Sequence, residues 1–460
     1  MSKFLFITKP FVVEPLGIMY LSGSLRRAGH DTYWLTTGDN LEKEVGKLSP
    51  DFVGYSVMTG DHKFFDEVNK NLRSKFDFFS VAGGPHPTFF PNYIYGSSFD
   101  AVCVGEGDSA LVDLVNNPEN NVVDNFSKKL YQEFDTVVFK NPLRHLVGNL
   151  DELPFPDREL IYSRDESQRN NPIKHFIAGR GCPYKCTYCF NHCYNDLYKG
   201  KGKMVRFRSV DNLLDEVEDV VAKYPTKFVY FQDDTFILNK GWLEEFSRKY
   251  SGRINIPFHA HVRANLVSED KIKLLKNANC FSVHIAVESG NDRLRNDVLK
   301  RNMSEKQIYD ACSLLHKYGI KFMLQNILGL PTGSLKNDFE TLEMNIKCKP
   351  TYAWASIFQP YPGTDLAKLC LEKGLIEESN LDDIQSSFFD RSLLNICNRK
   401  ETEYLQKLFA VATDYPIIYY SGLLKTLLKL PDDSKVRGLL NKLYKAYRKT
   451  SDEKLYGMKL

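Results

Sequence analysis

The sequence predicts an α/β protein with two sheet-containing parts and a helical C-terminal extension. Short apolar runs alternate with helical patterns through residues 1–117, and a second strand–helix series runs through residues 172–375. Residues 376–460 carry only helix-like spacing. Alternating strands and helices predict parallel sheets, because a parallel connection needs a crossover segment.

The first series contains five strand candidates joined by helical crossovers such as Leu16–Ala28 and His62–Lys75. This rhythm predicts a doubly wound parallel sheet, in which ligands bind at the carboxyl ends of the strands. We assign this domain, with the start of a connector, to residues 1–145. The expected strands are Phe4–Thr8, Thr32–Thr36, Asp51–Met58, Phe78–Ala82 and Ala101–Val104.

Residues 146–171 are expected to link the two domains. Pro154 and Pro156 stand in the stretch LDELPFPDREL, where they disfavour helix and favour an extended connector.

The second series, residues 172–375, repeats a strand–helix unit about six times, with helices such as Val210–Lys223, Lys306–Tyr318 and Leu335–Ile346. Six units are too few for a closed eight-unit barrel, so we expect a partial (βα)6 barrel that is open on one side. Catalytic residues should then lie at the carboxyl ends of its strands. The expected strands are His175–Gly181, Phe228–Asp234, Pro257–Asn265, Phe281–Ser289, Lys321–Gly329 and Tyr352–Tyr361.

Residues 376–460 mix leucines with lysines and arginines over the expected helices Tyr404–Val411, Gly422–Leu430 and Val436–Arg448. Such helices suit a membrane surface or an acidic partner, but a solvated cap on the barrel opening explains them as well. We favour the cap.

The bulk composition excludes several classes of protein. A formal net charge of +3 over 460 residues gives no overall nucleic-acid footprint. Of the ten cysteines, three fall within eight residues and the others are scattered, which favours reduced thiols and one metal site in the cytoplasm. The N-terminus lacks a signal-peptide pattern, and no apolar run is long enough to predict a transmembrane helix.

Cys182, Cys186 and Cys189 form a C-x3-C-x2-C motif directly after the first strand of the second series. Three thiolates can hold three irons of a [4Fe–4S] cluster and leave the fourth iron open to another ligand. The alternative is a zinc site completed by His192 or Cys193. We favour the cluster, because the loop begins a strand–helix series and a fourth protein ligand would close the open iron.

The motif resembles the cluster loop of the radical S-adenosylmethionine (SAM) enzymes, with Tyr188 at the family's aromatic position. Four further stretches resemble motifs of that family and follow in its order, over about residues 145–375. The resemblance implies that the open iron chelates the amino and carboxyl groups of SAM. The four stretches are Phe231–Asp234, Val287–Gly290, Gly329–Pro331 and Gln359–Thr364.

The charges of SAM suggest roles for the polar residues in these motifs. We expect Asp233 or Asp234 to accept hydrogen bonds from its ammonium, Arg263 to pair with its carboxylate, and Glu288 to bind its ribose or ammonium. For each acid, the competing interpretation is a helix cap or a surface ion pair. The other expected SAM contacts are Tyr188, Phe190, Ser289 and Gly329, and the expected residues at the reacting substrate are Gln359 and Tyr361.

The N-terminal domain resembles the Rossmann-like cobalamin-binding domain that precedes many radical SAM barrels. The similar stretches are Pro15–Gly17, Gly54–Thr59, Val81–His86 and Val104–Asp108. The Asp-x-His-x-x-Gly motif is absent, which suggests cobalamin held without a histidine below cobalt, or a degenerate domain that binds nothing. The expected cobalamin contacts are Leu16, Gly17, Ser56, Met58, Thr59, Gly83, Gly84, Pro85, His86, Gly105, Glu106 and Gly107.

The two resemblances together imply a cobalamin-dependent (class B) radical SAM methyltransferase. In that family, a 5′-deoxyadenosyl radical from SAM abstracts hydrogen from an unactivated carbon, which then takes a methyl group from methylcobalamin. An electron donor such as ferredoxin or flavodoxin is implied as a partner. Methylthiolation is disfavoured, because the N-terminal domain contains only Cys103.

Two other functions stay open at this point: a cobalamin-binding radical SAM enzyme that cyclises or rearranges its substrate, and a sensor without turnover. The substrate is equally open between a small metabolite, a lipid precursor and a residue of another protein. We expect it to lie between the ligand-bearing faces of the two domains.

Overall fold

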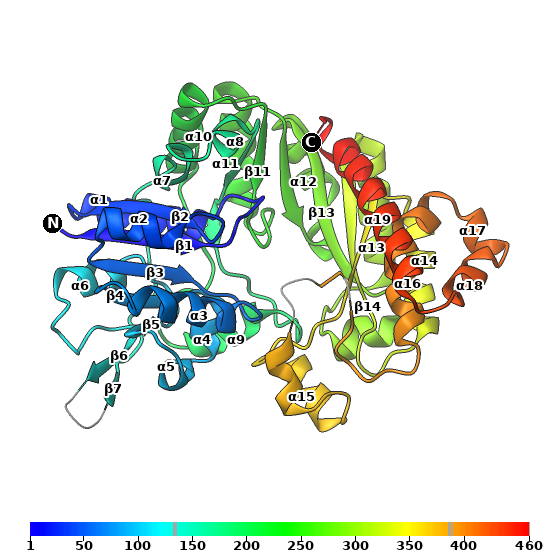
Figure 1. Cartoon of the computed structure of the whole chain (residues 1–460). Helices are drawn as coiled ribbons and strands as arrows, with labels where there is room; N and C mark the ends of the chain where they lie inside the picture. Colours follow the sequence, from blue (N-terminus) through cyan, green and yellow to red (C-terminus); the bar gives the residue numbers. More distant parts are fainter. Residues whose placement is uncertain (132–135, 385–387, 390, 460) are drawn as a thin grey trace. The chain divides into compact units, whose positions relative to one another are not determined.

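The computed structural model describes residues 1–131, 136–384, 388–389 and 391–459 (Figure 1). These residues form two compact units. The first comprises residues 1–175, 193–208 and 219–225, and the second comprises residues 176–192, 209–218 and 226–460. The first unit thus includes two segments that lie beyond the cysteine motif in the sequence.

The first unit is built on a sheet with the strand order β2-β1-β3-β4-β5-β6-β7. The neighbouring strands from β2 to β5 pair in parallel, and β6 and β7 extend the sheet in antiparallel fashion. The order 2-1-3-4-5 is that of a doubly wound sheet, so the predicted fold class is confirmed. The strands are β1 Lys3–Thr8, β2 Asp31–Thr36, β3 Phe52–Ser56, β4 Phe79–Gly83, β5 Ala101–Cys103, β6 Phe126–Tyr131 and β7 Thr136–Lys140.

The strands β1 and β3 to β5 consist largely of consecutive buried residues, as expected for a parallel sheet covered on both faces. Leu5, Ile7, Val53 and Val102 belong to one apolar core cluster of this unit. The helices are α1 Leu16–Arg27, α2 Leu41–Leu48, α3 His62–Arg73, α4 Pro85–Phe89, α5 Tyr93–Gly96 and α6 Ala110–Asn116.

The connector is less extended than its prolines predict. The 3-10 turn η1 (Leu150–Glu152) precedes the two prolines, and the short helices α7 (Glu159–Tyr162) and α8 (Glu166–Asn170) follow them. Only the stretch between η1 and α7 has the non-helical backbone that the prolines impose.

A buried ion pair fastens this connector to the loop after β1. The carboxylate of Glu14 accepts hydrogen bonds from the Arg158 guanidinium (3.1 Å), the His175 backbone N–H (2.7 Å) and the Tyr162 hydroxyl. Arg158 also donates to the His175 carbonyl at 2.6 Å. Glu14 is 3% exposed, so its charge depends on these partners for stabilisation.

The second unit is built on a sheet with the order β15-β14-β13-β12-β11-β8. The adjacent pairs from β11 to β15 are parallel. The first and last strands of this order stay apart among the described residues, as an open partial barrel requires. The strands are β8 Ile173–Phe176, β11 Phe228–Phe231, β12 Phe258–Val262, β13 Cys280–Glu288, β14 Lys321–Leu328 and β15 Tyr352–Ile357, with the short strands β9 Gly179–Arg180 and β10 Arg206–Phe207 between β8 and β11 in the sequence.

Helices alternate with these strands along the chain. Several of them start at a polar cap, for example Ser304, whose hydroxyl accepts from Gln307 N at 3.2 Å. The helices are α9 Phe190–Leu197, α10 Val210–Lys223, α11 Lys240–Arg253, α12 Glu269–Asn277, α13 Glu305–Tyr318, α14 Leu335–Cys348 and α15 Asp365–Glu372, with the 3-10 turn η2 Ala264–Leu266 and the π-helical turn η3 Leu294–Val298.

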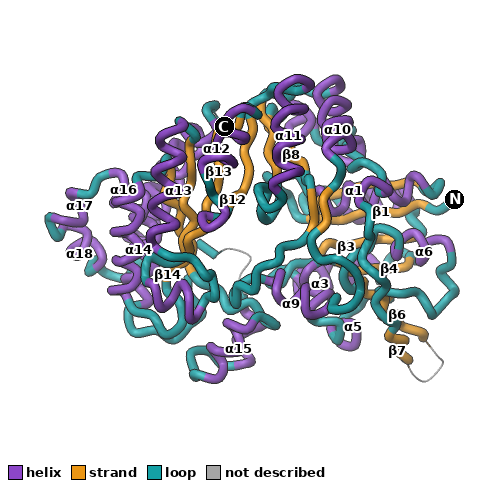
Figure 2. Tube along the Cα trace, turned by 180° about the vertical axis from the view of Figure 1, so that it is seen from behind, coloured by secondary structure: helices purple, strands orange, loops and turns teal. Residues whose placement is uncertain are grey.

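The C-terminal extension is helical, as predicted. After the turn η4 (Glu378–Asp383) it forms α16 Arg399–Asp414, α17 Ile417–Tyr420, α18 Leu423–Leu428 and α19 Ser434–Tyr456. Its buried apolar residues share one core cluster with residues of β14, α14 and β15, and Figure 2 shows α14 and α16 side by side. No helix within the described residues is long and apolar enough to cross a membrane.

We predict that Glu14→Gln lowers the free energy of unfolding by about 3 kcal/mol at neutral pH, because Arg158 then loses its buried counter-charge. The contacts around Glu14 lower its pKa from 4.5 to about 2. A carboxylate with a lowered folded-state pKa stabilises the fold above pH 4.5, and this contribution fades as the pH falls towards 2. The free energy of unfolding, measured with a denaturant, should therefore fall over this pH interval in the wild type and change less in the variant. The exposed Glu67→Gln serves as control, and a variant as stable as this control would refute the prediction.

Candidate functional site

The cysteine loop begins directly after β8 and is fixed at its start by Asp233, which follows β11. The two carboxylate oxygens of Asp233 accept the backbone N–H groups of Ala178 (3.0 Å) and Gly179 (2.7 Å). Burial nevertheless raises the pKa of Asp233 to about 7. Both oxygens are thus already engaged, and the geometry favours a role in positioning the loop over direct contact with a ligand's ammonium.

The neighbouring Asp234 differs from Asp233 in its surroundings. Asp234 is exposed, and its carboxylate is hydrogen-bonded to the side chain of Asn191. The Asn191 amide also lies 3.6 Å from the sulfur of Cys189. Of the two acids, Asp234 is therefore the one with an accessible carboxylate beside the cysteine loop.

The three cysteines lie on a loop that is held by backbone contacts. The Thr187 hydroxyl donates to the Val298 carbonyl at 2.7 Å, and the Thr187 carbonyl accepts from Leu366 N at 2.9 Å. Burial raises the pKa of Cys189 to about 12 and also raises that of Cys182. Such thiols release their protons on binding a metal, which is the chemistry that an iron–sulfur cluster requires.

The alternative interpretation, a zinc site, is weakened because His192, one of its expected ligands, is engaged elsewhere. The Nε2 atom of His192 accepts the backbone N–H of Asp365 at 3.3 Å, and its Nδ1 contacts the carbonyl of Cys189. In the described chain, the cysteine sulfurs are not among the groups of three ligand atoms gathered within 4.8 Å. With His192 engaged in this way, a zinc site would have to rely on Cys193 for its fourth ligand.

A buried network of charges surrounds Cys186. The guanidinium groups of Arg263 and Arg301 lie 3.6 Å and 3.5 Å from its sulfur. Arg301 also donates to the Tyr188 hydroxyl at 3.0 Å, and this hydroxyl donates to Glu288 Oε1 at 2.7 Å. The network joins the cysteine loop to the end of β13.

Both guanidinium groups keep an unused donor. The Nε atoms of Arg263 and Arg301 are buried and have no hydrogen-bond partner among the described residues. Arg263 also packs over the ring of Tyr184, with 3.8 Å from its Cζ to the ring centroid. Two buried cations beside a cysteine sulfur favour an anionic ligand, so the site fits a cluster and the carboxylate of SAM.

Glu288 occupies a strained backbone position. Its φ is +70°, in the left-handed region that non-glycine residues rarely adopt, and the register of β13 against β14 shifts between Ala286 and Glu288. Bulges of this kind redirect side chains and are frequent near active sites. The bulge places the Glu288 carboxylate beside Tyr188, and burial raises its pKa.

A cavity of about 230 Å3 opens beside this network. Gln359 donates to the Arg391 carbonyl at 2.8 Å, while its Oε1 is buried without a described partner. Tyr361 packs against Phe190, with ring centroids 5.6 Å apart. Gln359 and Tyr361, which were expected at the reacting substrate, thus line the same cavity as Tyr188 and Glu288. The lining residues include Tyr188, Glu288, Gln325, Trp354, Ser356, Gln359, Tyr361 and Phe388.

Tyr188 and Glu288 are the expected SAM residues that line this cavity, whereas others, including Ser289 and Gly329, lie outside its lining. Ser289 is 1% exposed, and its hydroxyl accepts the backbone N–H of Asn291 at 3.2 Å. Gly329 lines another cavity, of about 240 Å3, where its N–H donates to Asp338 at 3.1 Å. Ser289 thus directly follows β13, and Gly329 directly follows β14.

Arg301 is the residue of this network that sequence reasoning missed. It lies between η3 and α13, in the segment that connects β13 to the next helix. Segments after barrel strands are where catalytic residues gather, so an arginine between two structured turns was a usable signal.

The first unit presents apolar side chains near the carboxyl ends of its strands. Val12 and Val13, after β1, and Met58, after β3, are exposed by 84%, 53% and 57%. Ser56 is exposed at the end of β3, and Gly83 ends β4 beside it in the sheet. Such a face suits a flat, largely apolar ring, since ligands of doubly wound sheets bind at this edge.

The loop after β4 packs closely on the loop after β3. Gly84 has a φ of +99°, and a Cβ at this position would lie 3.1 Å from the carbonyl oxygen of Val57. Thr59 is buried and lies 3.3 Å from Nδ1 of His86, while Pro85 is exposed. These residues form a compact rim at the end of the sheet.

The histidines of this rim are stacked rather than exposed. The ring of His86 stacks on His62, with centroids 4.2 Å apart, and contacts Tyr93 edge-on. Burial lowers the pKa of His86 to about 3. His30 lies before β2, at the opposite edge of the sheet, and both of its ring nitrogens are hydrogen-bonded. Neither ring is placed to rise from the sheet as a ligand.

The expected cobalamin residues in the loop after β5 make structural contacts within the first unit. The carboxylate of Glu106 forms a bidentate pair with Arg206, at 2.7 Å and 3.1 Å. A Cβ on Gly105 would lie 1.8 Å from the hydroxyl of Tyr198, so only glycine fits there. Gly107 is half-buried beside them. These contacts explain why residues 193–208 join the first unit.

The remaining expected cobalamin residues begin α1. Leu16 is buried in the unit, whereas Gly17 is exposed. Because α1 follows β1, this start lies next to the apolar residues Val12 and Val13 in the sequence.

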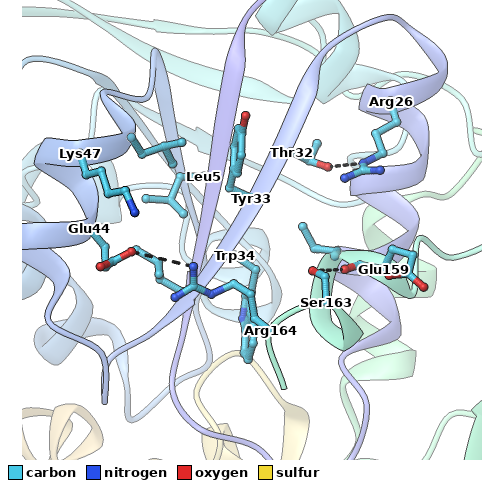
Figure 3. Close-up of a pocket in the computed structure, with 13 residues that line it drawn as sticks. Leu5, Arg26, Thr32, Tyr33, Trp34, Glu44, Lys47, Glu159, Ser163 and Arg164 are labelled. Carbon is cyan, nitrogen blue, oxygen red and sulfur yellow. Dashed lines mark hydrogen bonds and ion pairs between the residues drawn. The ribbon is translucent and has the colours of Figure 1, made fainter. Parts of the chain in front are cut away.

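A wider recess of about 390 Å3 in the first unit lies away from this edge (Figure 3). It runs along the edge strand β2 and is bordered by α2 and α7. Its arginines are engaged: Arg26 donates to Thr32 at 2.8 Å, and Arg164 faces Glu44 at 3.9 Å. The residues that line this recess differ from those named above for the carboxyl-end face, so the two are distinct.

We predict that Cys182→Ala, Cys186→Ala and Cys189→Ala each abolish assembly of an intact four-iron cluster, because three thiolates are the minimum for such a site. Iron content and visible absorption after anaerobic reconstitution measure the loss. Cys193→Ala is the matched control and should keep both signals. Full cluster absorption in the triple variant would contradict the assignment.

We predict that the chain binds cobalamin with no histidine nitrogen below cobalt, because His30 and His86 are engaged elsewhere. Electron paramagnetic resonance of the cob(II)alamin form should lack coupling to an axial nitrogen. His86→Ala should leave this spectrum unchanged. A nitrogen-coupled spectrum, or no corrin binding after reconstitution, would count against it.

Comparison with known proteins agrees with this division of the chain. Residues 176–343 match the model of the radical SAM superfamily, and residues 2–115 match that of the B12 binding domain. The chain is 28% identical to an uncharacterised methyltransferase of Pyrococcus horikoshii, over 80% of each protein.

Two further proteins extend the comparison. The anaerobic magnesium-protoporphyrin IX monomethyl ester cyclase of Cereibacter sphaeroides is 24% identical over 76% of this chain and 59% of its own length. The solved structure of the cobalamin-dependent SAM radical enzyme OxsB superposes with a TM-score of 0.70 at 17% identity, covering 99% of this chain and 72% of that chain. The chain thus combines a domain of the radical SAM superfamily with a B12 binding domain.

Proposed function

We propose that this chain transfers a methyl group to an unactivated carbon of its substrate as a cobalamin-dependent radical SAM enzyme. The observation that carries the proposal is the buried network of Cys186, Arg263, Arg301, Tyr188 and Glu288 on a chain that also has a B12 binding domain. When bound, the cluster and SAM supply a hydrogen-abstracting radical, and cobalamin supplies the methyl group.

The residues of the network have distinct tasks in this proposal. Arg263 and Arg301 hold positive charge where the cysteine thiolates and the carboxylate of SAM carry negative charge. Glu288, fixed by Tyr188, offers an acceptor to a ribose hydroxyl or to the ammonium. Asp234 is the other accessible carboxylate beside the loop and suits the ammonium. Asp233 positions the loop through its two backbone contacts.

The cavity of about 230 Å3 suggests how the substrate is held. Trp354, Ile327 and Phe388 provide apolar surface that excludes water from a reactive carbon radical. The free Oε1 of Gln359 can accept one hydrogen bond from the substrate. Tyr361 closes the wall at Phe190. We therefore expect a substrate whose reacting carbon lies in an apolar portion near one hydrogen-bond donor.

An external one-electron reductant is needed by radical SAM enzymes. We propose ferredoxin or flavodoxin as its source. The identity to the protoporphyrin ester cyclase favours one other reaction, in which the substrate radical closes a ring and takes up no methyl group.

The deciding experiment supplies the reconstituted enzyme with SAM that carries a trideuterated methyl group, a reductant and fractionated cell extract. We expect 5′-deoxyadenosine together with a product that retains all three deuterium atoms. Arg301→Gln should lower the rate of 5′-deoxyadenosine formation about 10- to 100-fold, the usual cost of losing a group that orients a metal site.

Arg26→Gln, in the recess along β2, is the matched arginine control and should keep the wild-type rate. A product without deuterium alongside 5′-deoxyadenosine would replace methyl transfer by cyclisation or rearrangement. No 5′-deoxyadenosine from the wild-type enzyme would refute an enzymatic role for the site.

A further inference from the structure

Three histidines of the barrel strands converge at a place that the cofactor network does not use. His259 and His261 lie on β12, and His284 lies on β13. Each offers a ring nitrogen, and the three atoms lie within 4.8 Å of one another. All three side chains are largely or fully buried.

The strand register explains why these rings meet. His259 and His261 are two residues apart, so they share one face of β12. His261 lies opposite His284, and His259 lies opposite Ser282 on the neighbouring strand. Phe258, on the alternate face of β12, packs against Phe246 and Tyr250 of α11. The helices therefore cover the alternate face, and the histidines line the inner face of the barrel.

The hydrogen bonds of the trio are incomplete. Nε2 of His259 and both ring nitrogens of His284 are buried without a partner in the part of the chain that the structure describes. Leaving a buried polar group unpaired is unfavourable, because the group has lost its hydrogen bonds to water. One ion bound to His259 and His284 would satisfy one unpaired nitrogen on each ring.

The nitrogens that do have partners are oriented as in metal sites. Nδ1 of His259 lies 2.7 Å from the Ser282 hydroxyl, and Nε2 of His261 lies 2.9 Å from the Tyr230 hydroxyl. A metal-binding histidine usually holds its second nitrogen in a hydrogen bond of this kind, which fixes the ring. This arrangement leaves Nε2 of His259 and Nδ1 of His261 for a metal.

The C-terminal helix closes this place within the same unit. The ring of Tyr456, at the end of α19, lies 5.5 Å from that of His259, and its hydroxyl is hydrogen-bonded to Tyr230. Burial lowers the pKa of His261 to about 4, which keeps the ring neutral at neutral pH and leaves the lone pair of one nitrogen available. The rings thus present neutral nitrogen ligands in a largely buried setting.

We propose that His259, His261 and His284 bind a divalent first-row transition-metal ion inside the barrel, with water as a fourth ligand. Three imidazoles without a carboxylate favour zinc and its neighbours over magnesium or calcium. Zinc–nitrogen bonds of about 2.0–2.1 Å require nitrogens about 3.4 Å apart, so small side-chain rotations close the site. The ion would cross-link β12 and β13, the strands that lead to Arg263 and Glu288.

The test uses the full chain with its iron–sulfur cluster in place, incubated with Zn2+ and freed from loosely bound metal. We expect about one zinc per chain beside the cluster iron. Absorption spectroscopy at the zinc edge, which iron does not disturb, should show imidazole nitrogens and no sulfur. Sulfur neighbours at about 2.3 Å would assign the zinc to cysteines and overturn the proposal, whatever the variants show.

The double variant His261→Gln/His284→Gln should lose the zinc and keep its iron. His145→Gln, in an exposed loop, removes a histidine elsewhere and should keep both metals. Zinc should also raise the midpoint of thermal unfolding of the wild type and of His145→Gln, but not that of the double variant. A wild type that retains no zinc, or a double variant that retains it, would refute the site.

Discussion

The cofactor site depends on the burial of two arginines beside a cysteine. Arg263 and Arg301 are 4% and 5% exposed, and both reach the sulfur of Cys186. A guanidinium keeps its charge at any pH a protein meets, so this pair needs nearby negative charge. Glu288 supplies one carboxylate, and the unpaired Nε atoms show that the protein alone does not satisfy the pair. The arginine pair therefore favours an anionic ligand beside Cys186.

The backbone at the end of β13 is strained beside this arginine pair. A regular strand would alternate its side chains, whereas the bulge between Ala286 and Glu288 and the positive φ of Glu288 turn this carboxylate towards Tyr188. Strain of this kind costs about 1–3 kcal/mol and persists where surrounding contacts fix it. Here the hydrogen bond from Tyr188 and the charge of Arg301 supply those contacts. The carboxylate is thus held before any ligand arrives.

Periodicity in the sequence was enough to predict both sheets, because buried parallel strands stand out as apolar runs between amphipathic helices. The three cysteines were also identifiable from local sequence, because their C-x3-C-x2-C spacing falls within eight residues. Long-range contacts could not be predicted in this way. Nothing near Asp233 in the sequence indicates that Ala178 and Gly179 hold its carboxylate. Arg301 lies well beyond the end of β13 in the sequence, and the pairing of Glu106 with Arg206 joins residues 100 positions apart.

The inner face of the barrel separates two ways of burying a polar group. Near the carboxyl ends of β12 and β13, the arginines cannot lose their charge, so acids and thiolates must accompany them. Two residues before Arg263, burial keeps the imidazole of His261 neutral. A neutral ring needs no counter-charge, yet it retains a lone pair that can bind a metal ion. The inner face of the barrel can therefore hold two kinds of site, arginines that need an anion and histidines that can bind a cation. The difference arises because only the histidines can give up their protons.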